Sequence, residues 1–480
     1  MRSARFVGVG VALVVAVVLL GTSISCQAPA AADLLLSGGI VVTMDGSGHV
    51  IPDGAIAVKG DRIVAVGPTS EVAGQFDARQ RIDLQGQIAL PGLINTHTHA
   101  PMVLYRGLAD DLALMDWLQK YIFPAEKATV SPDFVRVGTR LAALEMIESG
   151  TTTFADMYYF EDDIAEATRD AGLRAVLGQS VIMFPVADAA TPADALARAD
   201  AFISRWKNDA LITPAVAPHA PYTLDGPTLK AARALANTHG VPLLIHLAET
   251  RDEVKIIQDA HRQSPTQYLD SLGVWSGRSL AAHAVWLDDA DMATLSSRGV
   301  GLAHNPESNM KLASGVAAVP TWIERGIHAG LGTDGAASNN DLDMFEAMRT
   351  AAFLHKVSRS DPRVMPARLA LELATRRGAE ALGLADRIGS LEQGKQADII
   401  TVSVDGARQT PLFDPISHLV YVARGDDVRT TIVAGRILMR DGHVASLRKA
   451  DVLRDARAVA VQVRRAVADA AAVPASPAGK

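Results

Sequence analysis

Two histidines separated by one residue close an apolar run near the start of the chain. The run covers residues 91–99 and reads PGLINTHTH. Alternate side chains of a β-strand point to the same face, so His97 and His99 can present imidazole nitrogens to one point. Zinc binds imidazole and carboxylate ligands, and a catalytic zinc site leaves one coordination position for water. Two buried strand histidines without a metal would give the same pair, so the interpretation depends on further ligands.

Seven more apolar runs follow, at the spacing of strand-then-helix units. They cover residues 151–156, 173–178, 212–217, 242–246, 280–283, 300–304 and 328–334. Eight such units over about 250 residues match an α/β fold of the TIM (β/α)8 barrel type, whose functional groups lie at the C-terminal ends of the strands. A doubly wound open sheet is the alternative, but no G-x-G-x-x-G sequence follows the first strand.

Polar side chains end most of these runs. After the first pair, the groups at or just beyond the strand ends are His219, His246, Glu249, His283, His304 and Asp334. One polar group at a strand end is common, but this many metal-binding or proton-transferring groups at one rim are difficult to explain as core residues. The sequence therefore predicts an active site at the C-terminal rim of the barrel.

The N-terminus has the pattern of a secretory signal. Arg2 and Arg5 precede an apolar stretch at 6–20, which is short for a membrane span, and a small-residue run leads to Cys26. The end of this segment resembles a bacterial lipoprotein signal, in which the cysteine is lipidated; cleavage in the Ala-rich stretch 28–32 is the alternative. We expect residues 1–26 to be a lipoprotein-type signal peptide, and the protein to be exported, either periplasmic or membrane-anchored.

Composition restricts the partners and the metal ligands. The formal net charge is -7 and no run of Lys and Arg is present, which argues against a nucleic-acid partner. Cys26 is the only cysteine, so the mature protein has no disulfide and its metal ligands must be His, Asp or Glu. We expect a small-molecule substrate, membrane contact through the lipid anchor only, and a homo-oligomer.

The strand-end motifs resemble the metal-site signature of the amidohydrolase superfamily, in its mononuclear branch of nucleoside and nucleobase deaminases and triazine hydrolases. Within that branch the likeness is greatest to the methylthioadenosine/S-adenosylhomocysteine deaminases. It runs from about residue 34 to 446. The segments that carry it are 97–99 (HTH), 218–222 (PHAPY), 246–249 (HLAE), His283, 304–309 (HNPESN), 332–335 (GTDG) and 388–398 (IGSLEQGKQAD).

This resemblance implies a discontinuous second domain. In the family, residues before the barrel and residues after it join in one small β-sandwich. The domains expected are a first sandwich part at 33–90, the barrel at 91–385, a second sandwich part at 386–446, and a C-terminal helix and tail at 447–480. The apolar strands at 399–402 and 430–434 agree with this independently.

The resemblance also implies one divalent metal held by His97, His99, His246 and Asp334. Zinc is the expected ion and ferrous iron is the alternative. Such a metal lowers the pKa of a bound water to near 7 and so supplies a nucleophile at neutral pH. The fourth strand carries no lysine that could be carbamylated to bridge a second metal, which favours a mononuclear site.

Three polar groups take catalytic roles by the same resemblance. His283 would orient the attacking water, Asp334 would accept its proton, and Glu249 would protonate the ring nitrogen beside the carbon under attack. The alternative for Glu249 is a solvated carboxylate on a loop. The implied reaction is hydrolytic deamination of an adenine nucleoside, such as 5′-methylthioadenosine, adenosine or S-adenosylhomocysteine, with release of ammonia.

Substrate contacts follow from the matched positions. Trp117 corresponds to a residue that packs against the purine, Glu126 to one that binds the ribose hydroxyls, and His219 to one that contacts the ligand; Glu249 and Asp334 face the same substrate. His304 would contact the water or the substrate. Taken alone, Glu126 could equally be a helix-start charge, and Trp117 a packing residue.

One segment departs from the family pattern. Members that accept S-adenosylhomocysteine present arginines after the third strand, where a bidentate guanidinium pairs with the amino-acid carboxylate. Here residues 178–185 read GQSVIMFP, without arginine. Met183 and Phe184 therefore favour an apolar 5′ substituent or plain adenosine.

Other functions are compatible with parts of this pattern. A guanine or 8-oxoguanine deaminase, or an s-triazine chlorohydrolase, would use the same metal site and the same Glu249. A non-catalytic, lipid-anchored binding protein would require Glu249 and His283 to be idle. Metal content and ammonia release would distinguish these classes.

Overall fold

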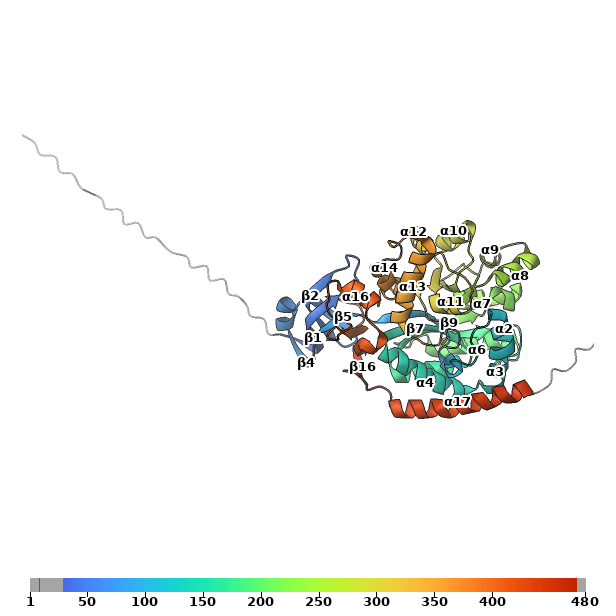
Figure 1. Ribbon diagram of the computed structural model, residues 1–480, viewed down its shortest axis with the longest axis horizontal. Helices are drawn as coiled ribbons and strands as arrows, with labels where there is room; N and C mark the ends of the chain where they lie inside the picture. The colour runs from blue at the N-terminus through green and yellow to red at the C-terminus, as the bar shows by residue number, and fades with distance from the viewer. Residues whose placement is uncertain (1–7, 9–28, 473–480) are drawn as a thin grey trace, which may run out of the picture.

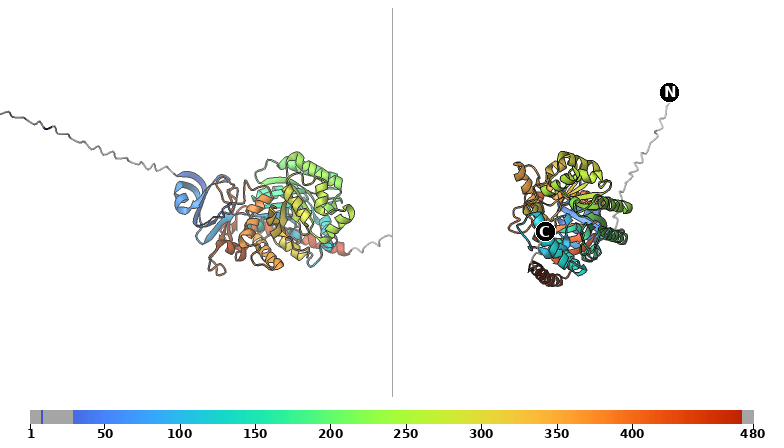
Figure 2. Two further views of the ribbon diagram at one scale, coloured as in Figure 1. Left: turned by 90° about the horizontal axis from the view of Figure 1, so that it is seen from above. Right: turned by 90° about the vertical axis from the view of Figure 1, so that its right-hand side faces the viewer.

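A computed structural model of the chain describes residues 29–472 and the single residue Gly8. The predicted signal peptide and Cys26 therefore lie outside the described residues. A barrel of strands and helices lies at one end of the molecule, and a separate sheet lies at the other end (Figures 1 and 2). None of the helices in the described part has the length and apolar character needed to cross a membrane.

Eight parallel strands form the barrel and are hydrogen-bonded in sequence order, which confirms the predicted TIM-barrel fold. The strands are β6 (Leu93–Thr98), β7 (Thr151–Tyr158), β8 (Arg174–Val181), β9 (Ile212–Pro218), β10 (Leu243–Leu247), β11 (Ser279–His283), β12 (Gly301–His304) and β13 (Ala329–Leu331). Bonds between the first and last strands close the ring: Thr96 Oγ1 donates to the carbonyl oxygen of Leu331 (2.8 Å), and the Asp334 N–H donates to that of His97 (2.9 Å).

Helices alternate with these strands and cover the outside of the barrel (Figure 1). One helix follows each strand: α4 (Pro132–Glu148), α5 (Glu161–Ala171), α6 (Pro192–Trp206), α7 (Gly226–His239), α8 (Arg251–His261), α10 (Asp289–Arg298), α11 (Pro306–Lys311) and α13 (Met344–Arg359). Shorter or later helices are α2 (Leu114–Trp117), α3 (Phe123–Thr129), α9 (Pro265–Ser271), α12 (Val319–Glu324), α14 (Ala367–Leu373), α15 (Arg376–Ala381) and α16 (Pro415–Tyr421). The capping is regular; for example, the Ser131 hydroxyl accepts the Phe134 N–H at the start of α4.

Small apolar residues fill the inside of the barrel. They come from alternate positions of seven strands, such as Leu244 of β10, Ala282 of β11 and Ala303 of β12, and they form one buried cluster with residues of α15. The intervening strand residues, such as Ile245 and Leu302, belong to the second, larger core between strands and helices. This period of two determines which strand-end side chains can face the barrel axis.

Segments from both ends of the chain share the second sheet, which confirms the predicted discontinuous domain. Its strands are β1 (Ala30–Val42), β2 (Val50–Lys59), β3 (Arg62–Pro68), β4 (Phe76–Asp83), β5 (Gln87–Pro91), β14 (Ile399–Ser403), β15 (Val428–Val433), β16 (Arg436–Arg440) and β17 (His443–Val444). β14 pairs antiparallel with β5, and β1 pairs parallel with β4 and β5, so all nine strands form one mixed sheet.

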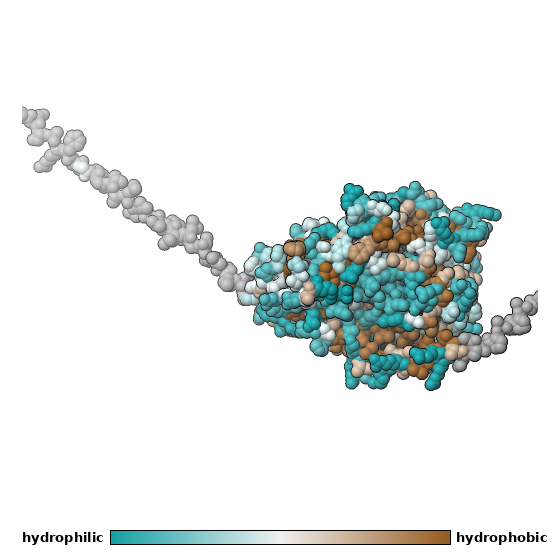
Figure 3. Space-filling model, in the orientation of Figure 1, coloured by the Kyte–Doolittle hydropathy of each residue, from teal (hydrophilic) through white to brown (hydrophobic). Residues whose placement is uncertain are grey.

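A buried ion pair joins this sheet to the barrel. The guanidinium of Arg174, at the start of β8, donates to both carboxylate oxygens of Asp398 (2.8 and 3.1 Å). The last helix, α17 (Lys449–Ala472), packs along α3 and α4 on the outside of the barrel. Polar residues cover most of the face seen in Figure 3, and apolar residues gather in smaller patches, one of them beside α17.

Candidate active site

Four side chains from three strands converge at the C-terminal rim of the barrel. His97 lies on β6 and His99 just follows it; His246 lies on β10, and Asp334 follows β13. Asp334 Oδ1 is 3.5 Å from His97 Nε2 and 3.4 Å from His99 Nε2, and the Nε2 atoms of His99 and His246 are 3.3 Å apart. The structure therefore brings together all four residues predicted as metal ligands.

The hydrogen bonds of these residues fit a divalent cation. The Nδ1 atoms of His99 and His246 each donate to a backbone carbonyl oxygen, of Met157 and His219 respectively, at 2.7 Å. This fixes the tautomer, so both Nε2 atoms carry lone pairs toward the common point. Nε2 of His97 is buried and has no hydrogen-bond partner. Two imidazole lone pairs, an unpartnered imidazole nitrogen and a carboxylate oxygen at one point form a set of ligands that suits a divalent cation.

Asp334 is held so that one carboxylate oxygen faces the histidines. The hydroxyls of Ser308 and Ser338 donate to Oδ2 (2.7 and 2.9 Å), and the Gly335 N–H donates to Oδ1 (2.7 Å). Burial would raise the pKa of Asp334, but the neighbouring imidazoles, first that of His97, hold this pKa well below its ordinary value. Asp334 is therefore ionised and suited to a metal.

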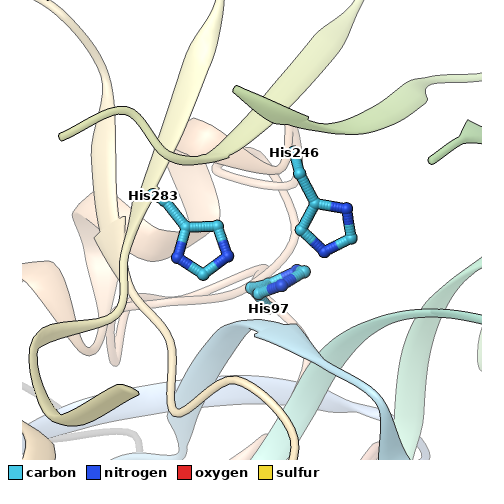
Figure 4. A group of neighbouring side chains, drawn as sticks. All are labelled: His97, His246 and His283. Carbon is cyan, nitrogen blue, oxygen red and sulfur yellow. The ribbon is translucent and has the colours of Figure 1, made fainter. Parts of the chain in front are cut away.

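His283 approaches the same point, but its proton lies on the other ring nitrogen than in His99 and His246. The rings of His97, His246 and His283 face one another (Figure 4), and their nearest nitrogens lie within 4.8 Å. Nδ1 of His283, however, is 3.0 Å from the amide nitrogen of Asn309, which can only donate. Nδ1 therefore accepts, and Nε2 bears the proton. This tautomer makes His283 a hydrogen-bond donor toward the centre and not a metal ligand.

Glu249 lies beside His283 at the bottom of the cavity. One carboxyl oxygen, Oε2, is 3.8 Å from His283 Nε2, and Ser314 Oγ is 3.4 Å from the other. The residue is 6% exposed. Burial raises the pKa of Glu249 well above its ordinary value, and the charges of Asp334 and Glu253 raise it further. Glu249 is therefore a buried carboxyl with a raised pKa, unlike the solvated carboxylate of the alternative interpretation.

A cavity of about 620 Å³, including open space at its mouth, covers these groups. Apolar and aromatic side chains form most of its wall, as is usual for sites that bind small molecules. The lining residues that concern the prediction are Trp117, Glu126, His219, Glu249, His283 and Asp334, together with Tyr158, Tyr159 and Tyr222.

Glu126 lies at the side of this cavity, on α3. A π-helical turn, Leu118–Ile122, connects α2 to α3. Turns of this kind are frequent at functional sites. The Tyr158 hydroxyl donates to Glu126 Oε1 (2.7 Å), and burial raises the pKa of Glu126 to about 7. Glu126 is thus a cavity residue and not a surface helix-start charge.

His304 differs from its prediction, because it does not line the cavity. The ring is fully buried between the barrel and the helices, with Nε2 3.1 Å from Nε2 of His355 on α13. Burial lowers the pKa of both rings, to about 4 for His355, so the pair is neutral. His304 therefore packs behind the site and is not in a position to contact substrate.

Asp156 was not singled out as a site residue from the sequence. It lies near the end of β7, where its Oδ1 accepts the Thr98 hydroxyl (2.7 Å) and the Ala100 N–H, and so holds the residues on either side of His99. An acidic residue at the end of the second strand-like run was the available signal. The serines on Asp334 gave no such signal, because Ser308 and Ser338 lie on a helix and a loop.

Comparison with known proteins identifies the family. Residues 88–438 match the amidohydrolase family, and residues 54–77 match an imidazolonepropionase-like composite domain of bacteria. The 5-methylthioadenosine/S-adenosylhomocysteine deaminase of Syntrophobacter fumaroxidans is 47% identical over 90% of this chain and 99% of its own length. The 5′-deoxyadenosine deaminase of Methanosarcina mazei is 43% identical over 90% and 98%.

Solved structures show the same similarity. An adenosine deaminase from Xanthomonas campestris with bound zinc has a TM-score of 0.89 and 39% identity, covering 91% of this chain and all of the other. An atrazine chlorohydrolase from Arthrobacter aurescens, complexed with zinc, has a TM-score of 0.82 and 25% identity over 89% of this chain and all of its own. The family match over residues 88–438 and relatives up to 47% identical over 90% of the chain show that this chain belongs to the amidohydrolase family.

Proposed function

We propose that the protein is a zinc-dependent deaminase that hydrolyses the amino group of adenine nucleosides and releases ammonia. The observation that carries this proposal is the buried carboxyl of Glu249, which lies beside the four side chains predicted to bind the metal, in a cavity that also contains Glu126. The names of the similar deaminases, which give methylthioadenosine, S-adenosylhomocysteine or 5′-deoxyadenosine as substrates, support it.

The polar groups around the metal position take separate roles in this reaction. The histidines and Asp334 would hold a divalent metal, which would supply an activated water at neutral pH. Glu249 donates its carboxyl proton to the ring nitrogen next to the carbon under attack, which makes that carbon more electrophilic. His283 donates a hydrogen bond from Nε2 to the attacking oxygen. Asp334, being ionised, accepts one proton from the attacking water and passes it to the amino group. The C–N bond then breaks and ammonia leaves, and the remaining hydroxyl proton returns to Glu249 as the carbonyl forms.

Glu126 is the residue proposed to recognise the ribose. One carboxylate can accept hydrogen bonds from two vicinal hydroxyls at once. Tyr158 holds one of its oxygens in the free protein, and the walls around both residues are aromatic. Trp117 and His219 line the same cavity and would contact the base and the ligand.

Replacing Glu126 with glutamine is expected to raise KM for adenosine about 10- to 100-fold, because a hydrogen bond to a charged group contributes roughly 1.5–3 kcal/mol. Steady-state ammonia release measures this effect. Tyr158→Phe is the matched control: it removes the partner of Glu126 but keeps the carboxylate, so its KM should change less. An unchanged KM in Glu126→Gln would contradict the ribose role.

The 5′ end of the nucleoside is proposed to enter a second cavity. This cavity, of about 600 Å³, shares Phe123, Glu126 and Tyr159 with the first, so it begins where the ribose would lie. Among its lining residues Phe184 is apolar and half exposed, and Lys127 is the single cation. An apolar group such as methylthio suits these walls better than the zwitterion of homocysteine, for which paired arginines would be expected.

The N-terminal sequence supports a proposal about location. A lipidated Cys26 would hold the enzyme at the outer side of the inner membrane or at the outer membrane. Cys26→Ala is expected to move the protein from the membrane fraction to the soluble periplasmic fraction, which immunoblotting of fractionated cells would measure. Unchanged partitioning would contradict lipid anchoring and leave cleavage in the Ala-rich stretch 28–32.

A further inference from the structure

The loop that presents Glu249 is fixed by a second glutamate outside the cavity. Glu253 lies in the first turn of α8, where the Thr250 hydroxyl caps the helix by accepting the Glu253 N–H (3.2 Å). Its own carboxylate turns back to the end of β10. Oε1 accepts the Ala248 N–H (2.7 Å) and Oε2 accepts the Glu249 N–H (2.9 Å). Both carboxylate oxygens of Glu253 thus accept backbone N–H groups, those of Ala248 and of the proposed proton donor Glu249.

The backbone at this point needs such support. Ala248 has a φ of +47°, in the left-handed region that residues other than glycine adopt at a cost. Its carbonyl oxygen accepts the Trp286 N–H (2.9 Å), so the peptide is held from both sides. Glu253 is 3% exposed and does not line the cavity. Burying a carboxylate costs free energy, and at Glu253 the bonds to the two backbone N–H groups offset this cost.

We propose that Glu253 is a positioning residue for deamination: its carboxylate holds the Ala248–Glu249 backbone so that the Glu249 carboxyl points at the substrate ring. The inference rests on the role proposed above for Glu249. Misplacement of a reacting group by about 1 Å can lower a rate about 100-fold. Removing the support should therefore lower the rate without removing any group that touches the metal or the substrate.

Glu253→Gln tests this inference in the full-length, zinc-loaded protein. The glutamine side chain has one acceptor oxygen for the N–H groups of Ala248 and Glu249. Its NH2 group, a donor, would face the second of these N–H groups. We expect kcat for adenosine to fall about 10- to 100-fold, with KM and zinc content near those of the wild type. Asp252→Asn is the matched control, because it removes an exposed acid from the same helix turn and should leave kcat unchanged.

A double-mutant cycle separates positioning from a general structural effect. If Glu253 acts through Glu249, Glu253→Gln should cause little further loss in a Glu249→Gln background. An equal loss in both backgrounds, or a kcat of Glu253→Gln within twofold of the wild type, would overturn the inference. Activity retained by Glu249→Gln alone would instead contradict the proposed function, so the two failures are distinguishable.

A second variant covers the case in which Glu253→Gln does not fold. Glycine adopts a positive φ without strain. Combining Ala248→Gly with Glu253→Gln therefore removes the backbone strain at position 248 that could prevent Glu253→Gln alone from folding. Ala248→Gly alone is the reference for this pair. We expect the double variant to bind zinc and to have a kcat at least about tenfold below that of Ala248→Gly. Equal kcat values in the two proteins would overturn the inference.

Discussion

Glu249→Gln is expected to lower kcat for adenine nucleosides about 1000-fold, while the protein still binds one zinc per chain. Glutamine has the same shape as the glutamic acid but has no carboxyl proton to transfer. The carboxyl of Glu249 belongs to neither group of atoms that converges on the metal position, so zinc should remain. Ammonia release and elemental analysis of the same preparation measure the two quantities.

Glu307→Gln provides the matched control for this variant. Glu307 is also a largely buried carboxyl, whose pKa burial raises to about 8, but it bonds to Asn339 and Thr350 and does not line the cavity. Its replacement should leave kcat within a few-fold of the wild type. If Glu249→Gln kept most of its activity, or lost its zinc, the assignment of Glu249 as the proton donor would be contradicted.

Removal of the metal is expected to abolish deamination and to lower thermal stability. Three imidazole nitrogens and the Asp334 carboxylate would remain packed together without a cation, and the free energy of metal binding would be lost from the folded state. At a zinc concentration about 1000 times the Kd, this amounts to about 4 kcal/mol. Dialysis against a chelator, followed by one equivalent of zinc, should remove and restore both activity and Tm.

Variants of His246 and His283 test which of the two histidines is a metal ligand and which is a hydrogen-bond donor. The Nε2 of His246 has a lone pair, because its Nδ1 donates to a carbonyl oxygen, whereas the Nε2 of His283 bears a proton. His246→Gln should therefore lose zinc, and His283→Gln should keep it and lose activity. Loss of zinc from both variants to the same degree would show that His283 is itself a ligand.

The sequence predicted the barrel and the rim because the parallel strands of a barrel all end on one side. A polar residue at each strand end is then brought to the others, however far apart they lie in the chain. The discontinuous sheet was predictable only through the family resemblance, because nothing local in the strand of residues 399–403 indicates that it pairs with residues 87–91.

The direction of each strand-end side chain was less predictable. His304 follows Leu302 at the period of two, and Leu302 belongs to the core between strands and helices, so His304 also faces the helices. His283 follows Ala281 in the same way, yet it reaches the cavity because its φ is +71°. A left-handed backbone at a histidine is uncommon and has no marker in the sequence. The structure therefore places His304 behind the cavity, away from the position that the sequence predicted.

The supports of the site were missed for a related reason. Glu253, Ser308 and Ser338 act on residues four to 26 positions away through bonds that only the folded chain defines. Glutamate in the first turn of a helix and serine in a loop are both common. Their types and positions alone gave no reason to separate them from ordinary helix and loop residues.

The most direct test of adenine nucleoside deamination is ammonia release by zinc-loaded protein lacking residues 1–26. The panel should contain methylthioadenosine, adenosine, S-adenosylhomocysteine, guanine, 8-oxoguanine and a chlorotriazine. We expect turnover of methylthioadenosine and adenosine, weak turnover of S-adenosylhomocysteine, and none of the others. Turnover only of a free base or of the triazine would contradict the nucleoside assignment and the roles of Glu126 and His219.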